Sequence, residues 1–571
     1  MFHRIRPRFR PGFNIFKCSI LCLIGFIATN VAEIQAQAIS QNNNGFISSN
    51  LPILIIDTQG REIVDENRIV ADMGIICNEN DKRNYLADSC NHYNGRIEIE
   101  LRGTTSLTFP KKPYRIETQD TSGENYNVPL LGMPAENDWI LHNPYSDKSL
   151  MRNVLAYKLA RDTQEYASRS AFVEVIVNED YKGVYVLLEK IKRDKNRVDI
   201  SPLEPDDIAG DALTGGYIIK IDNVSGEHVE TWQSSHNIRF QYHYPKPTEI
   251  VPEQKEYIQN FINQFEKSIS TPNCNSSAAD YSQIIDLDSF VHYFLISELT
   301  KNIDSYRLSV YMYKDRDSKN GKLTLAPVWD FNLAFGNADF FGGEYIWDWG
   351  LNTLNSAEAR QSVWQPLWWE YLVHEPEFIN RVVNRWQELR AGAWQTEKLL
   401  QYIDSKADTL REAQARNFER WPILGKYVWP NAFVGDTWEE DVDFLKNWLT
   451  ARLEWLDDNI PELALSANVN NYLTKFDEKT ILRQNYPNPF HSNTTIQYNL
   501  PEGVSTKLGI YNIIGQRIRL LKNTFESAGQ HFVNWDGRDD LGNRVSAGVY
   551  FYSLKSGSEE RMMKMILLHN F

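Results

Sequence analysis

The sequence predicts an α+β protein in which a β-rich half precedes a helical half, and a small all-β domain follows. Apolar and polar residues alternate in short runs up to about residue 250, which is the periodicity of strands. A helical period then dominates as far as residue 460, and alternation returns after residue 483. With 571 residues, 42% of them hydrophobic and 12% aromatic, the chain is long enough for several packed cores.

In the β-rich half, each of the segments "LPILIIDTQG", "GRIEIELRG", "FPKKPYRIET" and "GGYIIKIDN" is predicted to form a strand. The run "AFVEVIVNEDYKGVYVLLEKI" predicts two strands joined by a polar, Gly-containing turn, which makes a hairpin. One helix is expected at 147–162, because a single apolar face is formed there by Leu150, Val154, Leu155 and Leu159. Ser146 or Asp147 is the expected N-cap of that helix.

In the helical half, "DLDSFVHYFLISELTKN" predicts one helix, and Trp-rich amphipathic helices are expected within 360–420 and 437–460. Between them, "RLSVYMYKD" and "KLTLAPVWD" predict a hairpin whose second strand ends at Asp330. A buried strand end tolerates a carboxylate poorly unless something pairs with it. On spacing alone, Asp330 is equally compatible with a turn or cap and with a functional group.

The remaining boundaries follow from composition. Residues 461–482 are polar and are predicted to form a linker, and residues 483–571 are predicted to form a small β-sandwich of short strands. Residues 1–38 have the pattern of a secretory signal peptide, with basic residues, the apolar stretch "CSILCLIGFIA" and the small-residue site "AQA". A membrane anchor is the alternative, but this apolar stretch is too short to span a bilayer. The mature chain is therefore expected to be exported and without a transmembrane segment.

Export into an oxidising setting makes the cysteines informative. Cys77 and Cys90 lie close in sequence and are expected to form a disulfide, which leaves Cys274 as the odd cysteine. Three cysteines without histidines at ligand spacing do not predict a zinc site. The formal net charge of −15 argues against nonspecific nucleic-acid binding. The chain also lacks G-x-S-x-G, H-E-x-x-H and Walker A motifs, and its eleven histidines are scattered.

The C-terminal segment carries specific motifs. "LRQNYPNPFHSNTTIQYNLP", "IYNIIGQRI" and "WDGRDDLGNRVSAGVYFY" resemble the C-terminal sorting domain of cargo exported by the type IX secretion system. This resemblance implies passage through the outer membrane, contact with the type IX secretion machinery, and a secreted or cell-surface location. A carbohydrate-binding sandwich is the alternative reading of the same residues.

Residues 50–460 resemble the CotH kinase family, named for a spore-coat protein kinase. The matching stretches, in order, are "LRGTTSLTFPKKPYRIET", "NDWILHNPYSDKSLMRNVLAYKLAR", "VNEDYKGVYVLLEKIKRDKNRVDI", "ELTKNIDSYRLSVYMYKD" and "PVWDFNLAFGN". The resemblance implies an atypical protein-kinase-like fold, with a β-rich N-terminal lobe and a helical C-terminal lobe. It also implies transfer of phosphate from ATP to serine or threonine on a partner protein, with Mg2+ or Mn2+ as the metal.

Two acids match the kinase order, in which an Asp is followed by two strands and then by Asp-Phe. Asp304 is therefore expected to orient the attacking hydroxyl, and Asp330 to bind the metal. Kinases carry a metal-binding Asn five residues after the first acid, where this chain has Ser309, and the family often carries a second acid where this chain has Asn332. Ser309 and Asn332 are weaker, neutral ligands, which makes low or altered activity an open expectation.

The phosphate-binding cations are expected to be Arg102, beside a Gly-turn, and Lys112, on the strand face of Tyr114 and Ile116. A snorkelling edge lysine is the alternative for Lys112. The helix at 147–162 has no Glu, so the usual ion pair between a strand Lys and a helix Glu must be made differently. Lys190 begins the basic run "KIKRDKNR", which is either a solvated loop or a surface facing phosphates or an acidic substrate.

The sequence therefore predicts an exported CotH-like protein serine/threonine kinase. Two alternatives remain: a non-catalytic surface module used for adhesion, and an enzyme of the same fold that transfers another group such as AMP.

Overall fold

The computed structural model describes residues 45–65, 67–80, 82–224, 229–270, 280–354, 368–467, 481–485, 487–500, 503–527, 529–557 and 559–568. The predicted signal peptide and Cys274 lie outside these residues. The chain divides into two compact units, Met1–Ala464 and Leu465–Phe571. The α+β prediction is confirmed: the first unit holds a β-barrel, a second sheet and the helices, and the second unit is all β.

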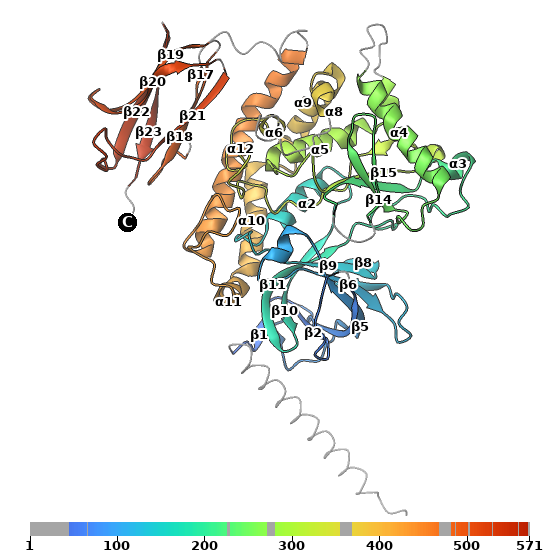
Figure 1. Ribbon diagram of the computed structural model, residues 1–571. Helices are drawn as coiled ribbons and strands as arrows, with labels where there is room; N and C mark the ends of the chain where they lie inside the picture. The colour runs from blue at the N-terminus through green and yellow to red at the C-terminus, as the bar shows by residue number, and fades with distance from the viewer. Residues whose placement is uncertain are drawn as a thin grey trace, which may run out of the picture. The chain divides into compact units, whose positions relative to one another are not determined.

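The first unit begins with a closed seven-stranded barrel, drawn in blue and cyan in Figure 1. Its strands, in barrel order, are β10 (Ser170–Val177), β11 (Asp180–Glu189), β9 (Asp138–His142), β6 (Tyr114–Gln119), β5 (Tyr93–Leu101), β3 (Ile69–Ile76) and β2 (Ile53–Asp57). Neighbours are antiparallel except β10 and β2, whose parallel pairing closes the ring. Alternate residues such as Ile97, Ile116 and Leu141 fill the interior, as the period of two requires.

A five-stranded antiparallel sheet follows. Its order is β13 (Thr231–Gln233), β14 (Arg239–Tyr244), β12 (Tyr217–Ile221), β15 (Val310–Lys314) and β16 (Leu323–Thr324). The predicted hairpin of the helical half therefore pairs with a strand from the β-rich half, and Ile221 lies opposite Val310. The remaining short strands of this unit are β1 (Ser48–Ser49), β4 (Asn84–Tyr85), β7 (Val128–Leu130) and β8 (Met133–Glu136).

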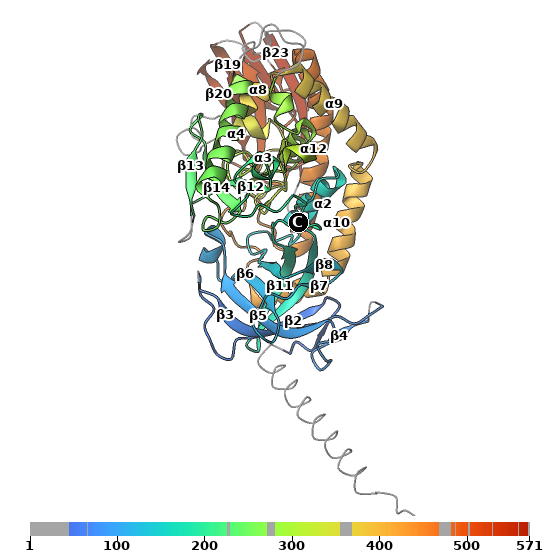
Figure 2. The same cartoon turned by 90° about the vertical axis from the view of Figure 1, so that its right-hand side faces the viewer.

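The helices of the first unit are mostly C-terminal to the barrel, as Figures 1 and 2 show. They are α2 (Arg152–Asp162), α3 (Gly210–Leu213), α4 (Pro252–Ser270), α5 (Leu287–Thr300), α6 (Gly350–Leu354), α8 (Trp368–Leu372), α9 (Pro376–Ala391), α10 (Thr396–Leu410), α11 (Ala413–Arg420) and α12 (Trp438–Ala467). The predicted helix at 287–300 is confirmed as α5, which is buried on all sides. Buried tryptophans of α9 and α12, such as Trp386 and Trp448, account for the Trp-rich pattern.

Two local predictions are corrected. The strand expected to run to Asp330 ends at Thr324, so Asp330 lies in irregular chain rather than at a strand end. The helix expected from 147 begins at Arg152. Asp147 nevertheless stabilises its start, because its Oδ2 accepts the backbone N–H of Arg152 at 2.8 Å and its Oδ1 pairs with the Arg152 guanidinium at 2.6 Å.

The expected disulfide is not formed, since Cys77 and Cys90 are both free thiols. Cys77 directly follows β3 and packs against the interior cluster of the barrel. Cys90 packs against a separate cluster that includes Ile53 and Ile76. Because successive residues of a strand point to opposite faces, the two thiols lie on different sides of the same sheet.

The second unit is a β-sandwich of two sheets. One sheet has the order β17 (Ile481–Leu482), β18 (Thr494–Leu500) and β21 (Gly529–Trp535), and the other has the order β20 (Arg517–Glu526), β19 (Val504–Asn512), β22 (Gly548–Ser556) and β23 (Glu559–Leu567). Trp535, Tyr552 and Leu554 belong to the core between them.

Among the described residues of the whole chain, no helix is long and apolar enough to cross a membrane.

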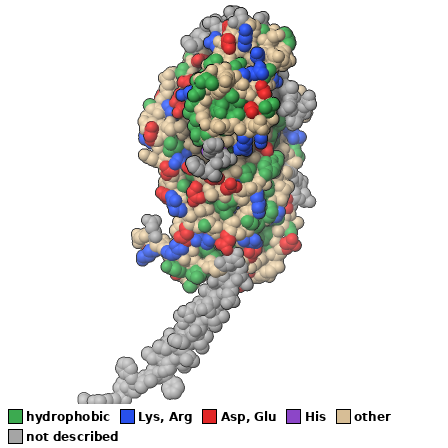
Figure 3. All heavy atoms as spheres, turned by 90° about the vertical axis from the view of Figure 1, so that its left-hand side faces the viewer, with side chains coloured by type: hydrophobic (Ala, Val, Ile, Leu, Met, Phe, Trp, Pro, Cys, Tyr) green, Lys and Arg blue, Asp and Glu red, His purple; other side chains and the backbone are tan. Residues whose placement is uncertain are grey.

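Acidic and basic side chains are interspersed on the face drawn in Figure 3, and no broad basic surface is visible there. This distribution agrees with the formal net charge of −15.

Candidate functional site

A cavity of about 560 Å³ opens in the first unit. Its walls come from the barrel, from the five-stranded sheet, and from the loops that follow α5 and β16. Six of the seven predicted site residues line it: Arg102, Lys190, Asp304, Ser309, Asp330 and Asn332. The fold therefore brings these residues together from distant segments of the chain, from Arg102 to Asn332.

Asp304 lies in the turn between α5 and β15. Its Oδ1 pairs with the guanidinium of Arg307 at 2.5 Å, and its carbonyl accepts the N–H of Leu308 at 2.9 Å. Burial raises the pKa of Asp304, whereas Arg307 opposes that rise. The contact with Arg307 therefore fixes the orientation of the Asp304 carboxylate at the wall of the cavity.

Asp330 lies six residues after β16 with φ of 61°, in the left-handed region that non-glycine residues seldom adopt. Its N–H donates to the hydroxyl of Tyr157 at 3.2 Å, and its carbonyl accepts from Asn302 Nδ2 at 3.3 Å. Burial raises the pKa of Asp330 to about 6, the nearby charge of Asp304 adds to this, and Arg102 opposes it. No hydrogen bond or ion pair joins the half-buried Asp330 carboxylate to a described side chain, and a bound cation would stabilise a carboxylate that is partly withdrawn from water in this way.

A third acid, Asp222, was missed by the sequence analysis. It follows β12, lines the same cavity, and pairs with Lys220 at 2.9 Å. Its charge raises the pKa of both Asp304 and Asp330. The sequence feature that could have identified Asp222 is that it follows an apolar run, as Asp330 does. The pairing of β12 with β15, which brings Asp222 to the cavity, is not visible in the sequence.

The cations of the cavity differ in how they are compensated. Lys190 pairs with Asp138, Lys220 with Asp222, and Arg307 with Asp304, and a further cation, Arg115, contacts the carboxylates Glu100, Glu117 and Asp138. Arg102 makes no ion pair with any described carboxylate, and its guanidinium lies 5.7 Å from the centre of the Trp329 ring. An arginine held in this way at the wall of a polar cavity is suited to binding an anion.

The turn after Arg102 is tight. Gly103 has φ of +107°, and a Cβ at this position would lie 2.2 Å from the Ser106 hydroxyl oxygen. Residues 103–106 all line the cavity. The predicted Gly-turn therefore exists and faces the cavity, as a backbone contact to phosphate requires.

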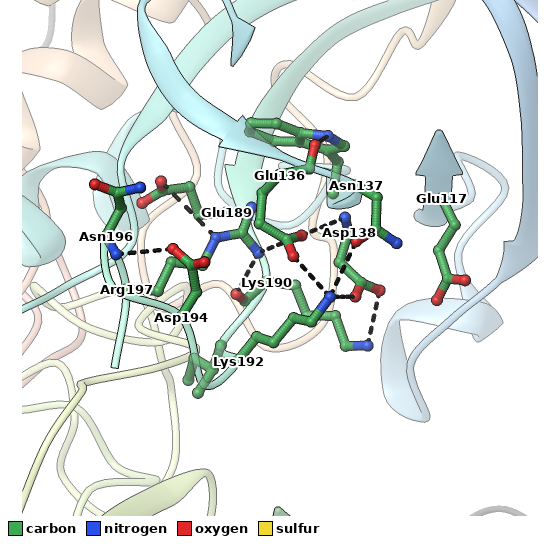
Figure 4. A network of polar contacts seen from close by, with 12 residues as sticks. Glu117, Glu136, Asn137, Asp138, Glu189, Lys190, Lys192, Asp194, Asn196 and Arg197 are labelled. Atoms are coloured by element: carbon green, nitrogen blue, oxygen red, sulfur yellow. Dashed lines mark hydrogen bonds and ion pairs between the residues drawn. The ribbon is translucent and has the colours of Figure 1, made fainter. Parts of the chain in front are cut away.

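Lys190 belongs to the network of Figure 4, and its partner is Asp138 on β9, at 3.0 Å. Burial lowers the pKa of Lys190 to about 8, and Asp138 opposes the shift. Lys192 pairs with Glu136 and Asp138 at 2.7 and 2.8 Å, and Arg197 donates to the carbonyl of Lys190 at 2.8 Å. Much of the basic run is therefore neutralised by carboxylates of the barrel. Lys190 directly follows β11 and Asp138 begins β9, so this ion pair joins two neighbouring strands of the barrel and involves no helix.

Lys112 is the predicted site residue that does not line the cavity. It precedes β6, and its Nζ donates to the carbonyl of Leu107 at 2.5 Å, which closes the loop that carries Arg102. Its neighbour Lys111 is buried, and its Nζ donates to the side chain of Asn417 at 2.8 Å. Tyr114 and Ile116, which were expected to share a face with Lys112, are buried side chains of the barrel core.

The donors around Asp330 fit Mg2+ better than a metal held by protein side chains alone. Among the described residues, no three His, Cys, Asp or Glu side chains are arranged to hold a metal ion. Mg2+ usually takes one or two carboxylates and completes its shell with water and substrate phosphates. Asp330 supplies one carboxylate, and Asn332 and Ser309, which line the same cavity, supply neutral oxygens, so these residue types fit that donor set.

Two family models match parts of this chain. The model of the CotH kinase protein family matches residues 99–456, and the model of the FlgD Ig-like domain matches residues 490–560. The chain is 23% identical over 269 residues to inner spore coat protein H of Bacillus subtilis (strain 168), which covers 47% of this chain and 67% of that protein.

Two solved structures are similar only in small parts. Dimeric latent PorU from Porphyromonas gingivalis is 18% identical over 16% of this chain and 10% of its own, with a TM-score of 0.14. PorZ, a surface component of the type IX secretion system of the same organism, is 23% identical over 15% of this chain and 11% of its own, with a TM-score of 0.12. The family match rests instead on residues 99–456, which are more than half of the chain and include every candidate site residue. The chain belongs to the CotH kinase protein family.

Proposed function

We propose that this protein transfers the γ-phosphate of ATP to a serine or threonine hydroxyl of an envelope or extracellular protein. The observation that supports this most is the meeting of Asp304, Asp330 and Arg102 in one polar cavity. Phosphoryl transfer needs a group that orients the hydroxyl, a carboxylate for the metal, and a cation for the phosphates. The barrel then acts as the N-terminal lobe of an atypical kinase-like fold, and the helical part acts as the C-terminal lobe.

The cavity residues divide the work. Arg102 and the backbone of the turn after it bind phosphate oxygens, and Lys190 is a second, partly neutralised contact. Asp330, with Asn332 and Ser309, holds Mg2+ or Mn2+, which neutralises phosphate charge when bound. Lys112 does not contact ATP in this proposal; its hydrogen bond to the carbonyl of Leu107 stabilises the loop that carries Arg102.

Asp304 acts on the acceptor. Its Oδ2 accepts the hydrogen bond of the serine or threonine hydroxyl and aligns that oxygen with the γ-phosphorus. As the new O–P bond forms, the bond between the γ-phosphorus and the bridging oxygen of ADP breaks, and the hydroxyl proton passes to Asp304. A carboxyl whose pKa is raised by burial is a better proton acceptor than an exposed aspartate, and Arg307 keeps it oriented.

Two alternatives are carried by specific observations. Ser309 and Asn332 are neutral where kinases have stronger ligands, which favours a non-catalytic adhesion module. An enzyme of the same fold that transfers AMP is the second alternative, since the proposed contacts to phosphate and metal serve attack at either phosphate.

One set of measurements separates these functions. Thermal denaturation of the mature protein with ATP and Mg2+ or Mn2+ is expected to show a raised melting temperature, because ligands that bind the native state stabilise it. No shift at millimolar nucleotide favours the adhesion module. With ATP labelled on the γ- or the α-phosphate, label on protein from the γ position alone supports the kinase. Label from the α position alone supports AMP transfer.

We also propose that the protein is exported, with residues 1–38 as a signal peptide and residues 483–571 as a type IX sorting domain. The signal pattern and the sorting motifs of the sequence support this proposal. The acceptor is then a protein of the envelope or the medium.

A further inference from the structure

Helix α2 holds the backbone at Asp330 with two side chains. Asn153 and Tyr157 lie one helical turn apart, so they share a face of α2. Asn153 Oδ1 accepts the N–H of Phe331 at 2.6 Å, and the Tyr157 hydroxyl accepts the N–H of Asp330 at 3.2 Å. Tyr157 also stacks on Trp329, with ring centres 5.9 Å apart. Three successive residues around the acid, 329–331, are therefore held by one helix face.

The amide of Asn153 has its orientation fixed. A backbone N–H can only donate, so the Asn153 atom that faces Phe331 must be the oxygen. The other amide atom, Nδ2, then donates, and it lies 3.2 Å from Nε2 of His142. His142 Nε2 must therefore carry a lone pair, which defines a neutral imidazole with its proton on Nδ1.

The surroundings of His142 favour this neutral form. His142 ends β9 and lines the cavity. Burial lowers its pKa to about 4, the positive charges of Arg102 and Lys111 add to this, and Asp147 opposes it. The ring therefore remains an acceptor for Asn153 at neutral pH.

The backbone of Asp330 needs such support. With φ of 61°, it is in a conformation that costs an L-residue on the order of 1 kcal/mol or more, and that persists only where neighbours impose it. When a hydrogen bond that imposes it is lost, the carboxylate is free to leave its position at the cavity.

From these contacts we infer that His142 and Asn153 are positioning residues: the ring acceptor of His142 orients Asn153, and Asn153 sets the direction of the Asp330 carboxylate. This inference rests on the proposed function in giving Asp330 its role as metal ligand. Neither residue touches the reacting atoms, and both act through the backbone of Phe331.

The sharpest variants change one hydrogen-bonding atom at a time. His142→Gln retains an acceptor for Asn153, whereas His142→Phe keeps a ring and removes the acceptor. We expect His142→Phe to lower kcat by about 10- to 100-fold and to weaken Mn2+-dependent ATP binding, while KM for the acceptor protein stays near that of the parent. His142→Gln is expected to restore most of both. His374→Phe, at an exposed histidine of the first unit, is the matched control and should match the parent.

A second measurement is independent of catalysis. In full-length protein labelled with ¹⁵N-histidine, the resonances of His142, assigned by their loss in His142→Gln, are expected to show the neutral Nδ1–H tautomer at pH 7. In Asn153→Asp the acceptor for Phe331 remains, but the donor to His142 is gone. His142 is then expected to change to the Nε2–H tautomer and to donate to the new carboxylate.

The outcomes separate the two levels of the proposal. An Nε2–H or protonated His142 in the parent overturns the inference, and so does a correctly folded His142→Phe that keeps parental turnover and Mn2+-dependent binding. The parent can show the Nδ1–H tautomer, and Asn153→Asp the change of tautomer, while the parent shows neither ATP binding nor turnover. The proposed function then fails, but the hydrogen bonds from His142 through Asn153 to Phe331 are supported. Should His142→Phe not fold, the tautomer change in Asn153→Asp decides the inference alone.

Discussion

The side chain of Asn302 bonds the backbone of both acid-bearing loops: its Nδ2 donates to the carbonyl of Asp330 at 3.3 Å, and its Oδ1 accepts the N–H of Asp304 at 3.5 Å. Asn302 is buried and follows α5 by two residues. Because one amide bonds both loops, a change at either acid can disturb the other. Variants at the two acids are therefore best compared by nucleotide binding and by turnover together.

Asp330→Asn is expected to abolish metal-dependent ATP binding and to lower turnover on the order of 10²-fold or more. The reason is that it removes the carboxylate proposed as metal ligand, whereas the other two proposed ligands, Ser309 and Asn332, are neutral. The fold should survive, since Asn is nearly isosteric with Asp. Calorimetric titration of ATP with and without Mn2+ measures the effect. If this variant binds ATP and metal as tightly as the parent and still turns over, the assignment of the metal ligand is wrong.

Asp304→Asn is expected to abolish transfer while ATP and metal binding remain close to those of the parent. The reason is that the proposed role of Asp304 is to meet the acceptor hydroxyl with one oxygen, while Arg307 holds the other. Single-turnover assays with γ-labelled ATP, paired with the binding titration, check this. Equal loss of binding in Asp304→Asn and Asp330→Asn would contradict the division of roles.

Arg102→Ala is expected to raise the Kd for ATP by about 10- to 100-fold, the effect of losing a charge-assisted contact of about 1.5–3 kcal/mol. Adenosine, which has no phosphates, should bind the variant and the parent alike. Arg411→Ala, at an exposed arginine paired with Asp408, is the matched control. An unchanged Kd for ATP in Arg102→Ala would show that the phosphates do not contact Arg102 and bind elsewhere in the cavity.

Asp441→Asn is expected to flatten the pH dependence of stability. Burial raises the pKa of Asp441 from 3.8 to about 6, opposed by Arg152 and Lys148. A carboxyl with a raised pKa in the folded state favours folding below pH 4, and this contribution is lost as pH rises through 6. The loss is at most about 3 kcal/mol at pH 7.

Chemical denaturation at pH 4, 5.5 and 7 measures this effect. Asp443→Asn, two residues along α12 and exposed, is the control and should follow the parent. A parental pH dependence in Asp441→Asn would place the titrating group elsewhere.

Deletion of residues 483–571 is expected to leave ATP-dependent stabilisation intact and to stop release from the cell, since the predicted sorting segment and the cavity belong to different compact units. Fractionation of cells that express the full and shortened chains, with the same thermal titration on each, tests both halves of the expectation. Normal secretion of the shortened chain would show that this segment is not a sorting signal.

Much of the fold follows from local periodicity. Alternating apolar and polar residues predicted the strands β5, β6, β10 and β11, and a long apolar run predicted α5. These are local sequence features, and the structure has these elements where they were expected. The extent of "KLTLAPVWD" was overestimated because β16 pairs with β15 over only two residues. Strand length depends on available partners, which periodicity does not report.

The candidate site was predictable where a motif carried it and not where only tertiary contacts define it. Asp304 and Asp330 stand in a recognisable order along the chain. Asp222 reaches the cavity through the pairing of β12 with β15, and His142 through the pairing of β9 with β11. The free thiols of Cys77 and Cys90 have the same cause, because closeness in sequence did not reveal that they face opposite sides of a sheet.

The pairing of Ile221 with Val310 has a consequence for how this site tolerates change. Asp222 directly follows one of these residues and Ser309 directly precedes the other, so a slip of one residue between the strands would turn every side chain of β15 to the opposite face. Single-residue insertions or deletions within β12 or β15 should therefore be far more damaging than loop insertions of several residues elsewhere. The backbone hydrogen bonds between β12 and β15 fix the positions of Asp222 and Ser309 relative to each other, so insertions and deletions in these two strands should be poorly tolerated.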